Sequence, residues 1–190
     1  MSNIRIGYVI GSLAKNSINR QLANAMVKLA PENVEMVELE IKDLPLYSHD
    51  YDADYPAVAN EFKDSVSSVD GVLFITPEFN RGIPAALKNA IEWGSRPWGQ
   101  NVWGKPAATL GASGGGIGTA VAQQHLRAIL LHLGATVMGQ PEGYIQLTEG
   151  LIDDNHNVTS PETEKFFQFW IQSFSDFVAQ HAAVKEEVGA

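Results

Sequence analysis

The chain has 190 residues and a formal net charge of −9, with 13 basic residues against 22 acidic ones. This length suits one domain with a sizeable core, and the acidic balance without a basic cluster argues against a nucleic-acid partner. The sequence contains no cysteine, which excludes disulfides, thiolate metal ligands and cysteine nucleophiles. No basic and apolar leader precedes the first predicted strand, and no apolar run could span a bilayer. We therefore expect a cytoplasmic protein without membrane insertion, forming a single domain over residues 1–190.

Apolar runs rich in β-branched residues alternate along the chain with amphipathic segments. Ile4–Ile10 predicts a first strand, and Ser17 is a plausible N-cap for a helix over residues 18–29. The charged run over residues 34–39 predicts an edge strand, and a helix follows over residues 58–69.

Residues 43–56, which join that edge strand to the next helix, are acidic and rich in tyrosine. Long connections in compact domains are usually functional or mobile. We expect this one to form a lid or an interface segment.

The stretch VLFITPEFNRGIPAALKNAIEW, residues 72–93, is the most informative part of the chain. A buried strand over residues 72–76 ends at Pro77, which lacks the N–H that a sheet ladder needs. A polar loop follows, and Pro84 opens a helix, where a proline in the first turn is tolerated.

The next apolar run, residues 106–111, leads into a glycine-rich loop over residues 112–118. A helix over residues 119–133 follows and ends at Gly134.

Residues 135–138 predict a fifth strand, which residues 144–147 extend after a bend at Pro141. A last helix over residues 161–183 carries many aromatic side chains that we expect in the core: Phe166, Phe167, Phe169, Trp170, Phe174 and Phe177.

This alternation predicts an α/β fold, a flavodoxin-like three-layer sandwich with a five-stranded parallel sheet in the order 2-1-3-4-5. Strands one, three and four are then neighbours. The loops that follow them, residues 11–17, 77–83 and 112–118, should meet at the carboxyl end of the sheet, where such folds bind ligands.

The loop over residues 11–17 suits a phosphate group. It offers the side chains of Ser12, Lys15, Ser17 and Asn19 beside the N–H groups of a helix N-terminus. A plain N-cap by Ser17 is the alternative interpretation. The loop does not fit GxxxxGK[ST], and the glycine run is not in the register of GxGxxG, so neither a triphosphate P-loop nor a Rossmann site is indicated.

The segment from Gly111 to Gly115 fits G-x-S-x-G, so a serine hydrolase with Ser113 as nucleophile is a further alternative. That chemistry needs an acid and then a histidine later in the chain. His125 lies within the helix that follows the motif, and Asp153 and His156 are too close together in sequence for the usual arrangement, which disfavours a hydrolase.

Three segments resemble the signature segments of the NAD(P)H-dependent FMN reductases, a flavodoxin-like group that includes quinone, chromate and azo-dye reductases. They are GSLAKNSINRQLA, residues 11–23, PEFNRGIPAALKNAIEW, residues 77–93, and KPAATLGASGGGIGTAVAQQHLR, residues 105–127. The resemblance spans residues 4–145. It implies FMN as cofactor, NADPH or NADH as co-substrate, and ping-pong hydride transfer to quinones, azo compounds, free flavin or metal oxyanions.

Because the flavin carries this chemistry, the resemblance implies no catalytic side chain. It does imply three zones of flavin contact. The phosphate and ribityl chain would be held by Ser12, Lys15, Ser17, Ile18 and Asn19. The isoalloxazine would be bordered, mainly through backbone groups, by Pro77, Glu78, Phe79 and Asn80, and closed over by Ser113, Gly114 and Gly115.

Two departures from the family pattern concern these zones. The family usually has arginine where this chain has Ala14, and tyrosine where it has Phe79. The first change removes a bidentate clamp on phosphate, for which Lys15 would compensate in part.

The resemblance favours a homodimer, with the third helix and the aromatic stretch containing Trp93, Trp98 and Trp103 at or near the contact. A homotetramer through Arg127 and Glu142 is the larger assembly that it implies. The partners are otherwise small-molecule electron acceptors.

Three further residues have interpretations of their own. Arg81 and Arg96 near the mouth would receive dinucleotide phosphates, with ordinary solvated charges as the alternative. Asn89 should hydrogen-bond a neighbouring loop, because a buried amide needs partners.

A non-enzymatic electron carrier of flavodoxin type, without direct oxidation of NAD(P)H, remains the other class of function.

Overall fold

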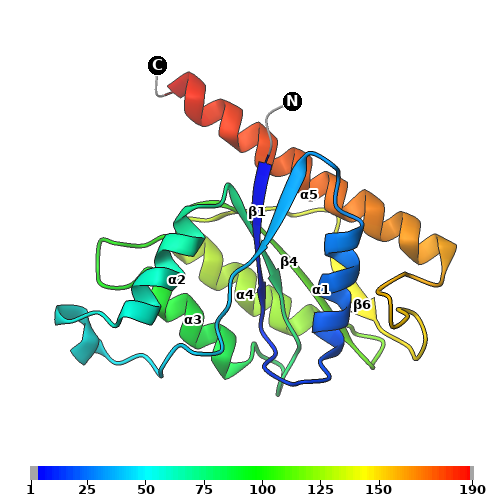
Figure 1. The fold of residues 1–190 in the computed structure, drawn as a ribbon, viewed down its shortest axis with the longest axis horizontal. Coiled ribbons are helices and arrows are strands. Elements are labelled where there is room, and N and C mark those ends of the chain that lie inside the picture. Colours follow the sequence, from blue (N-terminus) through cyan, green and yellow to red (C-terminus); the bar gives the residue numbers. More distant parts are fainter. Residues whose placement is uncertain (1–3, 189–190) are drawn as a thin grey trace.

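A parallel β-sheet forms the centre of the computed structural model, which describes residues 4–188 and the side chains of residues 4–182 (Figure 1). The strand order is β2-β1-β3-β4-β5, with β6 also paired to β4. The strands are β1 Ile4–Ile10, β2 Val34–Glu38, β3 Gly71–Ile75, β4 Pro106–Ser113, β5 Thr136–Val137 and β6 Gly143–Gln146. The predicted 2-1-3-4-5 order is confirmed.

The fifth position of the sheet is shared by two short strands. β5 pairs with Pro106 and Ala107 at the start of β4, and β6 pairs with the last part of β4 up to Ser113. This is the extension after a bend that the sequence predicts. It also explains why β4 runs to Ser113 rather than ending at Gly111, because β6 supplies hydrogen-bonding partners for the extra residues.

The helices cover both faces of this sheet. They are α1 Ile18–Lys28, α2 Ala57–Ser67, α3 Ala85–Ser95, α4 Ala120–His132, α5 Pro161–Val188 and a short 3-10 helix, η1, over His49–Ala53. In Figure 1, α1 and α5 lie on one side of the sheet, and α2, α3 and α4 lie on the other. Each side has its own apolar cluster, so both faces of β3 are buried, as expected for a continuous apolar run in a parallel sheet.

The aromatic residues of α5 are only partly in the core, which corrects one prediction. Phe167, Trp170 and Phe174 are fully buried, whereas Phe169 is 59% exposed. The buried side chains follow the spacing of one helical face, and Phe169 lies on the opposite face. Phe166 is half-buried beside the same cluster.

The connection over residues 43–56 is held firmly against α3. Asn89 Oδ1 accepts a hydrogen bond from Tyr47 N at 2.8 Å, and Asn89 Nδ2 donates to Pro45 O at 2.9 Å. The indole N–H of Trp93 donates to the same carbonyl at 2.7 Å. The prediction for Asn89 is therefore confirmed, while the role of the connection as a lid or interface stays a prediction.

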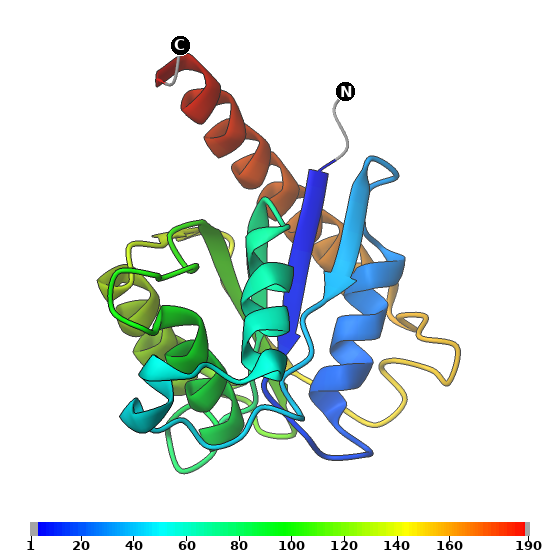
Figure 2. The same cartoon turned by 60° about the vertical axis from the view of Figure 1, so that its left-hand side comes forward.

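The loops that follow β1, β3 and β4 lie together at one end of the sheet, at the bottom of Figures 1 and 2. Within the described residues, no helix combines the length and apolar character that crossing a membrane would require.

Gly111 lies where two backbones approach each other beneath these loops. A Cβ added there would lie 2.2 Å from Thr76 O and 2.1 Å from Thr119 Oγ1. Only glycine fits this contact between β4 and its neighbours. The first glycine of the G-x-S-x-G pattern thus has a packing reason that does not involve a nucleophile.

Gly111→Ala should lower the free energy of unfolding by about 1 to 3 kcal/mol, because an inserted methyl group in a packed core forces backbone shifts. Urea denaturation of the purified protein would measure it. Gly139→Ala is the matched control, since an added Cβ there meets nothing within 4 Å, and we expect a change within about 0.5 kcal/mol. Equal stabilities for the two variants would contradict this account.

Candidate functional site

The candidate site is the rim formed by three loops, which we name loop 1 (residues 11–17), loop 2 (residues 76–84) and loop 3 (residues 114–119). They follow β1, β3 and β4, which are adjacent in the sheet. The hydrogen bonding of the sheet continues into loops 1 and 2. Gly11 N donates to Ile75 O and Thr76 N donates to Leu110 O, both at 2.9 Å. The three loops therefore start from a common, hydrogen-bonded edge.

Asn19 joins the start of α1 to the end of β4. Its Nδ2 donates to Ala112 O at 2.9 Å, and its Oδ1 accepts from Ala112 N at 2.9 Å. The side chain is buried, so both halves of the amide are used within the protein. The resemblance implies that Asn19 contributes to the phosphate zone, which stays a prediction; in the structure its side chain joins the start of α1 to the end of β4.

Glu78 makes the corresponding connection between loop 2 and α4. Its Oε2 accepts from Ala122 N in the first turn of α4 at 3.0 Å. Thr119, the N-cap residue of that helix, makes no side-chain capping bond, and α4 has no acidic residue in its first turn. Glu78 thus supplies from another loop the negative charge that a helix N-terminus favours.

Loop 2 contains a tight turn, and the carboxylate of Glu78 also holds one residue of this turn. Phe79 and Gly82 exchange two backbone hydrogen bonds at 3.0 and 2.9 Å. Between them Asn80 and Arg81 have φ of 51° and 63°, as a type I′ turn requires. Arginine is unusual in this conformation, and its guanidinium is held by Glu78 Oε1 at 3.1 Å.

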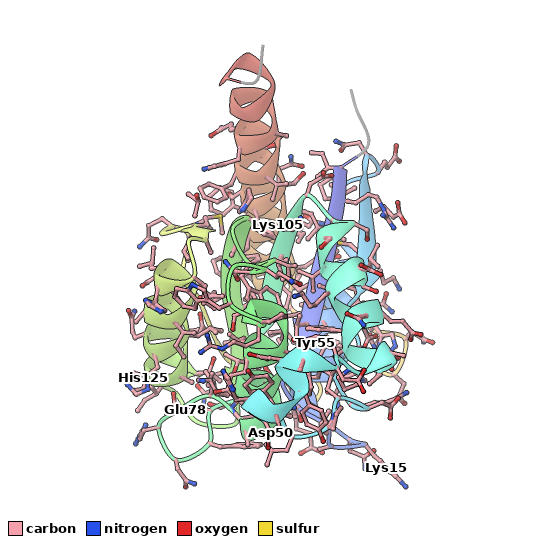
Figure 3. All side chains as sticks on the ribbon, turned by 90° about the vertical axis from the view of Figure 1, so that its left-hand side faces the viewer. Lys15, Asp50, Tyr55, Glu78, Lys105 and His125 are labelled. Atoms are coloured by element: carbon pink, nitrogen blue, oxygen red, sulfur yellow. The ribbon has the colours of Figure 1, made fainter. Side chains whose placement is uncertain are left out.

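Loop 1 provides polar and cationic groups. Ser17 caps α1 by accepting from Arg20 N at 3.4 Å, as predicted, and Ser12 Oγ accepts from Ala14 N at 3.4 Å. Lys15 has no hydrogen-bond or ion-pair partner in the part of the chain whose side chains are described. Figure 3 shows it projecting from the same end of the molecule where Glu78 lies.

Each loop also presents one large apolar side chain to solvent. Leu13, Phe79 and Ile117 are 55%, 56% and 51% exposed. A Cβ on Gly114 would meet nothing within 4 Å, so the space over loop 3 is open. An apolar surface of this kind beside a cationic loop fits a ligand that has a flat ring at one end and an anion at the other. A phosphorylated flavin is such a ligand, and the donor set suits it.

Most of the predicted site residues lie at this rim. Of the two arginines expected at the mouth, Arg81 and Arg96, only Arg81 lies there. Arg96 is the C-cap of α3, and a helix of 11 residues places it about 16 Å from loop 2. It is therefore not at the mouth formed by its own chain, where Arg81 lies. The sequence reasoning missed Leu13 and Ile117, whose apolar character within polar loops was the available signal.

The side of loop 1 facing β2 carries a strong ion pair. The guanidinium of Arg20 donates to both carboxylate oxygens of Glu38, at 3.0 and 2.7 Å. This hydrogen bonding raises the pKa of Arg20. The hydroxyl of Tyr8 donates to the same carboxylate at 3.4 Å, and burial followed by the charge of Glu38 raises the pKa of Tyr8.

Ser113 lacks the partner that a serine nucleophile requires. Its hydroxyl donates to Gly115 O at 3.0 Å and accepts from Gly115 N at 3.2 Å. No histidine hydrogen-bonds Ser113 among residues 4–182, and His125 lies on α4 (Figure 3). The geometry gives the hydrolase alternative no support.

Comparison with known families agrees with this site. Residues 4–149 match the profile of the family described as NADPH-dependent FMN reductase. Because the match covers most of the chain, the protein belongs to this family of flavodoxin-like oxidoreductases, which use NAD(P)H with FMN.

Several members of the family are similar to this chain over most of its length. A 2-hydroxy-1,4-benzoquinone reductase from Burkholderia sp is 48% identical over 92% of this chain and 96% of its own length. A quinone reductase from Pseudomonas putida is 41% identical over 94% and 97%. Among solved structures, the flavoenzyme NAD(P)H:(acceptor) oxidoreductase FerB from Paracoccus denitrificans has a TM-score of 0.90 at 43% identity, over 94% of this chain and 98% of that one.

Glu78→Ala should lower the free energy of unfolding by about 1 kcal/mol, the usual cost of losing a helix N-cap. It should also weaken FMN binding, because loops 2 and 3 lose their connection. Urea denaturation and quenching of flavin fluorescence would measure the two effects. Glu78→Gln keeps an acceptor for Ala122 N and should lie between wild type and the alanine variant; if all three behave alike, the connection is unimportant.

Proposed function

We propose that this protein passes hydride from NADH or NADPH through FMN bound at the three-loop rim to a quinone, by a ping-pong reaction. Azo compounds, free flavin and metal oxyanions are further acceptors of the same kind. The observation that carries the proposal is the convergence on one rim of loop 1, which carries Lys15, with loops 2 and 3, each of which exposes one large apolar side chain. The names of its relatives as quinone reductases support the choice of acceptor.

FMN, when bound, supplies a ring that can accept a hydride from a nicotinamide and later release two electrons. The remaining tasks belong to the chain. Lys15, Ser12 and the N-terminal end of α1 would hold the phosphate, because they combine a positive charge with hydrogen-bond donors. This assignment gives Lys15 the role that arginine has elsewhere in the family, since Ala14 offers no charge.

Loops 2 and 3 would bind the ring. Pro77, Phe79 and Asn80 border it on one side, and Ser113, Gly114 and Gly115 on another. The N–H groups of Phe79 and Gly115 already donate to Gly82 O and Ser113 Oγ, so other backbone N–H groups of these loops would stabilise negative charge that develops there. Phe79 and Ile117 would keep water from the ring. A single open face then serves the nicotinamide and the acceptor in turn, which is the physical basis of a ping-pong scheme.

Purified protein loaded with FMN should oxidise NADH or NADPH in the presence of menadione. Initial rates at several fixed menadione concentrations should give parallel double-reciprocal lines, because donor and acceptor use one face alternately. Intersecting lines would overturn the ping-pong scheme. An absence of NAD(P)H oxidation with FMN bound would favour the electron-carrier alternative.

Lys15→Met should raise the dissociation constant for FMN about ten- to a hundredfold, since hydrogen bonds to charged groups contribute about 1.5 to 3 kcal/mol. Riboflavin lacks the phosphate, so its affinity should not change. Lys165→Met is the control, because Lys165 is exposed on α5. Equal weakening of FMN and riboflavin would show that Lys15 does not contact the phosphate.

A homodimer is part of the same proposal. A cavity of about 900 Å³ lies between α3 and α4, and its apolar lining includes Ile91, Ile129 and Leu133. Trp98, which is 86% exposed, also borders it. Two-fold symmetry would let the Trp98 of each subunit enter the cavity of the other, and a buried tryptophan is a frequent centre of binding energy.

Trp98→Ala should shift the protein from dimer toward monomer in analytical ultracentrifugation. Phe169→Ala, which removes an exposed aromatic ring from α5, is the matched control and should leave the dimer intact. If the wild-type protein is itself a monomer, the proposal fails. A wild-type tetramer that Arg127→Ala converts to a dimer would support the larger assembly through Arg127 and Glu142.

A further inference from the structure

A cavity of about 300 Å³ lies beside loop 1, on the side away from loops 2 and 3. Its walls are Ile10, residues 12–15 and Arg20 on one side, and on the other residues 38–42, which begin at the last residue of β2. Its volume is at the lower end of the range for small-molecule sites. It opens at the carboxyl end of the sheet, as the rim does.

The lining of this cavity combines both signs of charge. Lys15, Arg20 and Lys42 contribute three cations, and Glu38 and Glu40 contribute two carboxylates. The wall therefore carries a net positive charge on a chain whose net charge is −9. An anion is favoured there, but an isolated inorganic anion would also face two carboxylates.

These charges differ in how firmly they are already paired. Arg20 and Glu38 form the two-bond ion pair described above, with both side chains partly buried. Glu40 and Lys42 form a pair at 2.9 Å with both side chains largely exposed, and such pairs are weak. Lys15 has no partner among the described side chains. Glu40 and Lys42 are thus available to a ligand, and Lys15, which the proposed function places at the flavin phosphate, borders the same cavity.

A ribose 5′-phosphate group uses all three of these residues. Its two ring hydroxyls donate to a carboxylate, and its phosphate accepts from ammonium groups. In Rossmann folds an acidic residue accepts hydrogen bonds from the ribose hydroxyls of NAD; this chain lacks the Rossmann glycine motif, but a carboxylate beside a ribose can act in the same way. Glu40 lies two residues beyond Glu38, the last residue of β2.

The distance between this cavity and loops 2 and 3 suits the length of a dinucleotide. The order β4-β3-β1-β2 separates the strand before loop 3 from β2 by three strand spacings, or about 14 Å. A dinucleotide whose nicotinamide lies on a ring at loops 2 and 3 can place its second nucleotide at that distance. Lys15 would stand between the flavin phosphate and the pyrophosphate and reduce their repulsion.

We propose that this cavity binds the adenosine half of the reduced dinucleotide, with Glu40 accepting from the ribose hydroxyls and Lys42 and Lys15 binding phosphate. A 2′-phosphate would replace the hydroxyl that Glu40 binds and would be repelled by its charge. The protein therefore prefers NADH to NADPH. This inference rests on the proposed function, since it concerns the co-substrate of the same site.

The test compares wild type with Glu40→Gln as FMN-loaded protein. Glu40→Gln should raise KM for NADH about tenfold, the loss expected for a hydrogen bond to a charged group, with kcat unchanged. KM for NADPH should stay equal or fall, so the preference for NADH shrinks. Calorimetry with 5′-AMP, a readout independent of turnover, should show wild-type binding that both Glu40→Gln and Lys42→Gln weaken.

Glu35→Gln is the matched control, because Glu35 is an exposed carboxylate of β2 paired with Arg5 outside the cavity; it should behave as wild type. The inference is overturned if Glu40→Gln keeps wild-type values for both dinucleotides and for 5′-AMP, or if wild type does not bind 5′-AMP. It is also overturned if Glu40→Gln and Lys42→Gln change FMN affinity instead, which would assign the cavity to the flavin phosphate. Failure of the proposed function looks different, since FMN-loaded wild type would then oxidise neither dinucleotide.

Discussion

The pair of hydrogen bonds between the Asn19 amide and the backbone of Ala112 is the interaction on which the site depends. It satisfies the backbone N–H and C=O of one residue at the end of β4 and both halves of a buried side-chain amide. A buried amide with only one of these bonds would leave a costly unpaired group. The start of α1 is therefore held at one position relative to loop 3, and the contact from Glu78 to α4 holds loop 2 in the same way.

Because the three loops are held in fixed relative positions, the rim offers different chemical groups at its two ends. All three loops expose one large apolar side chain, but loop 1 also carries hydroxyls and an ammonium that has no partner among the described side chains. One end of the rim thus favours an anion and the other favours an aromatic ring. A preformed site of this polarity binds a phosphorylated ring without having to order its own loops first, which lowers the cost of binding.

The predictions that follow from local pattern were the most accurate ones. The strand over Ile4–Ile10, the Ser17 cap and the end of α4 at Gly134 agree with the structure, because each depends on neighbouring residues only. The errors concern long-range packing. Phe169 was expected in the core but faces solvent, and Arg96 was expected at the mouth but lies at the far end of α3.

The sequence by itself determined the alternation of strands and helices, the resulting sheet order and the meeting of the loops after β1, β3 and β4 at one end of the sheet. These follow from hydrophobic period, from helix and turn residues and from the handedness of parallel connections. Only the tertiary structure decided that Asn19 and Glu78 hold the rim together, that Gly111 is required by the approach of Thr76 and Thr119, and that a charged cavity lies beside loop 1. The reason is that these contacts join residues from 8 to 93 positions apart, and no local propensity specifies which distant atoms will meet.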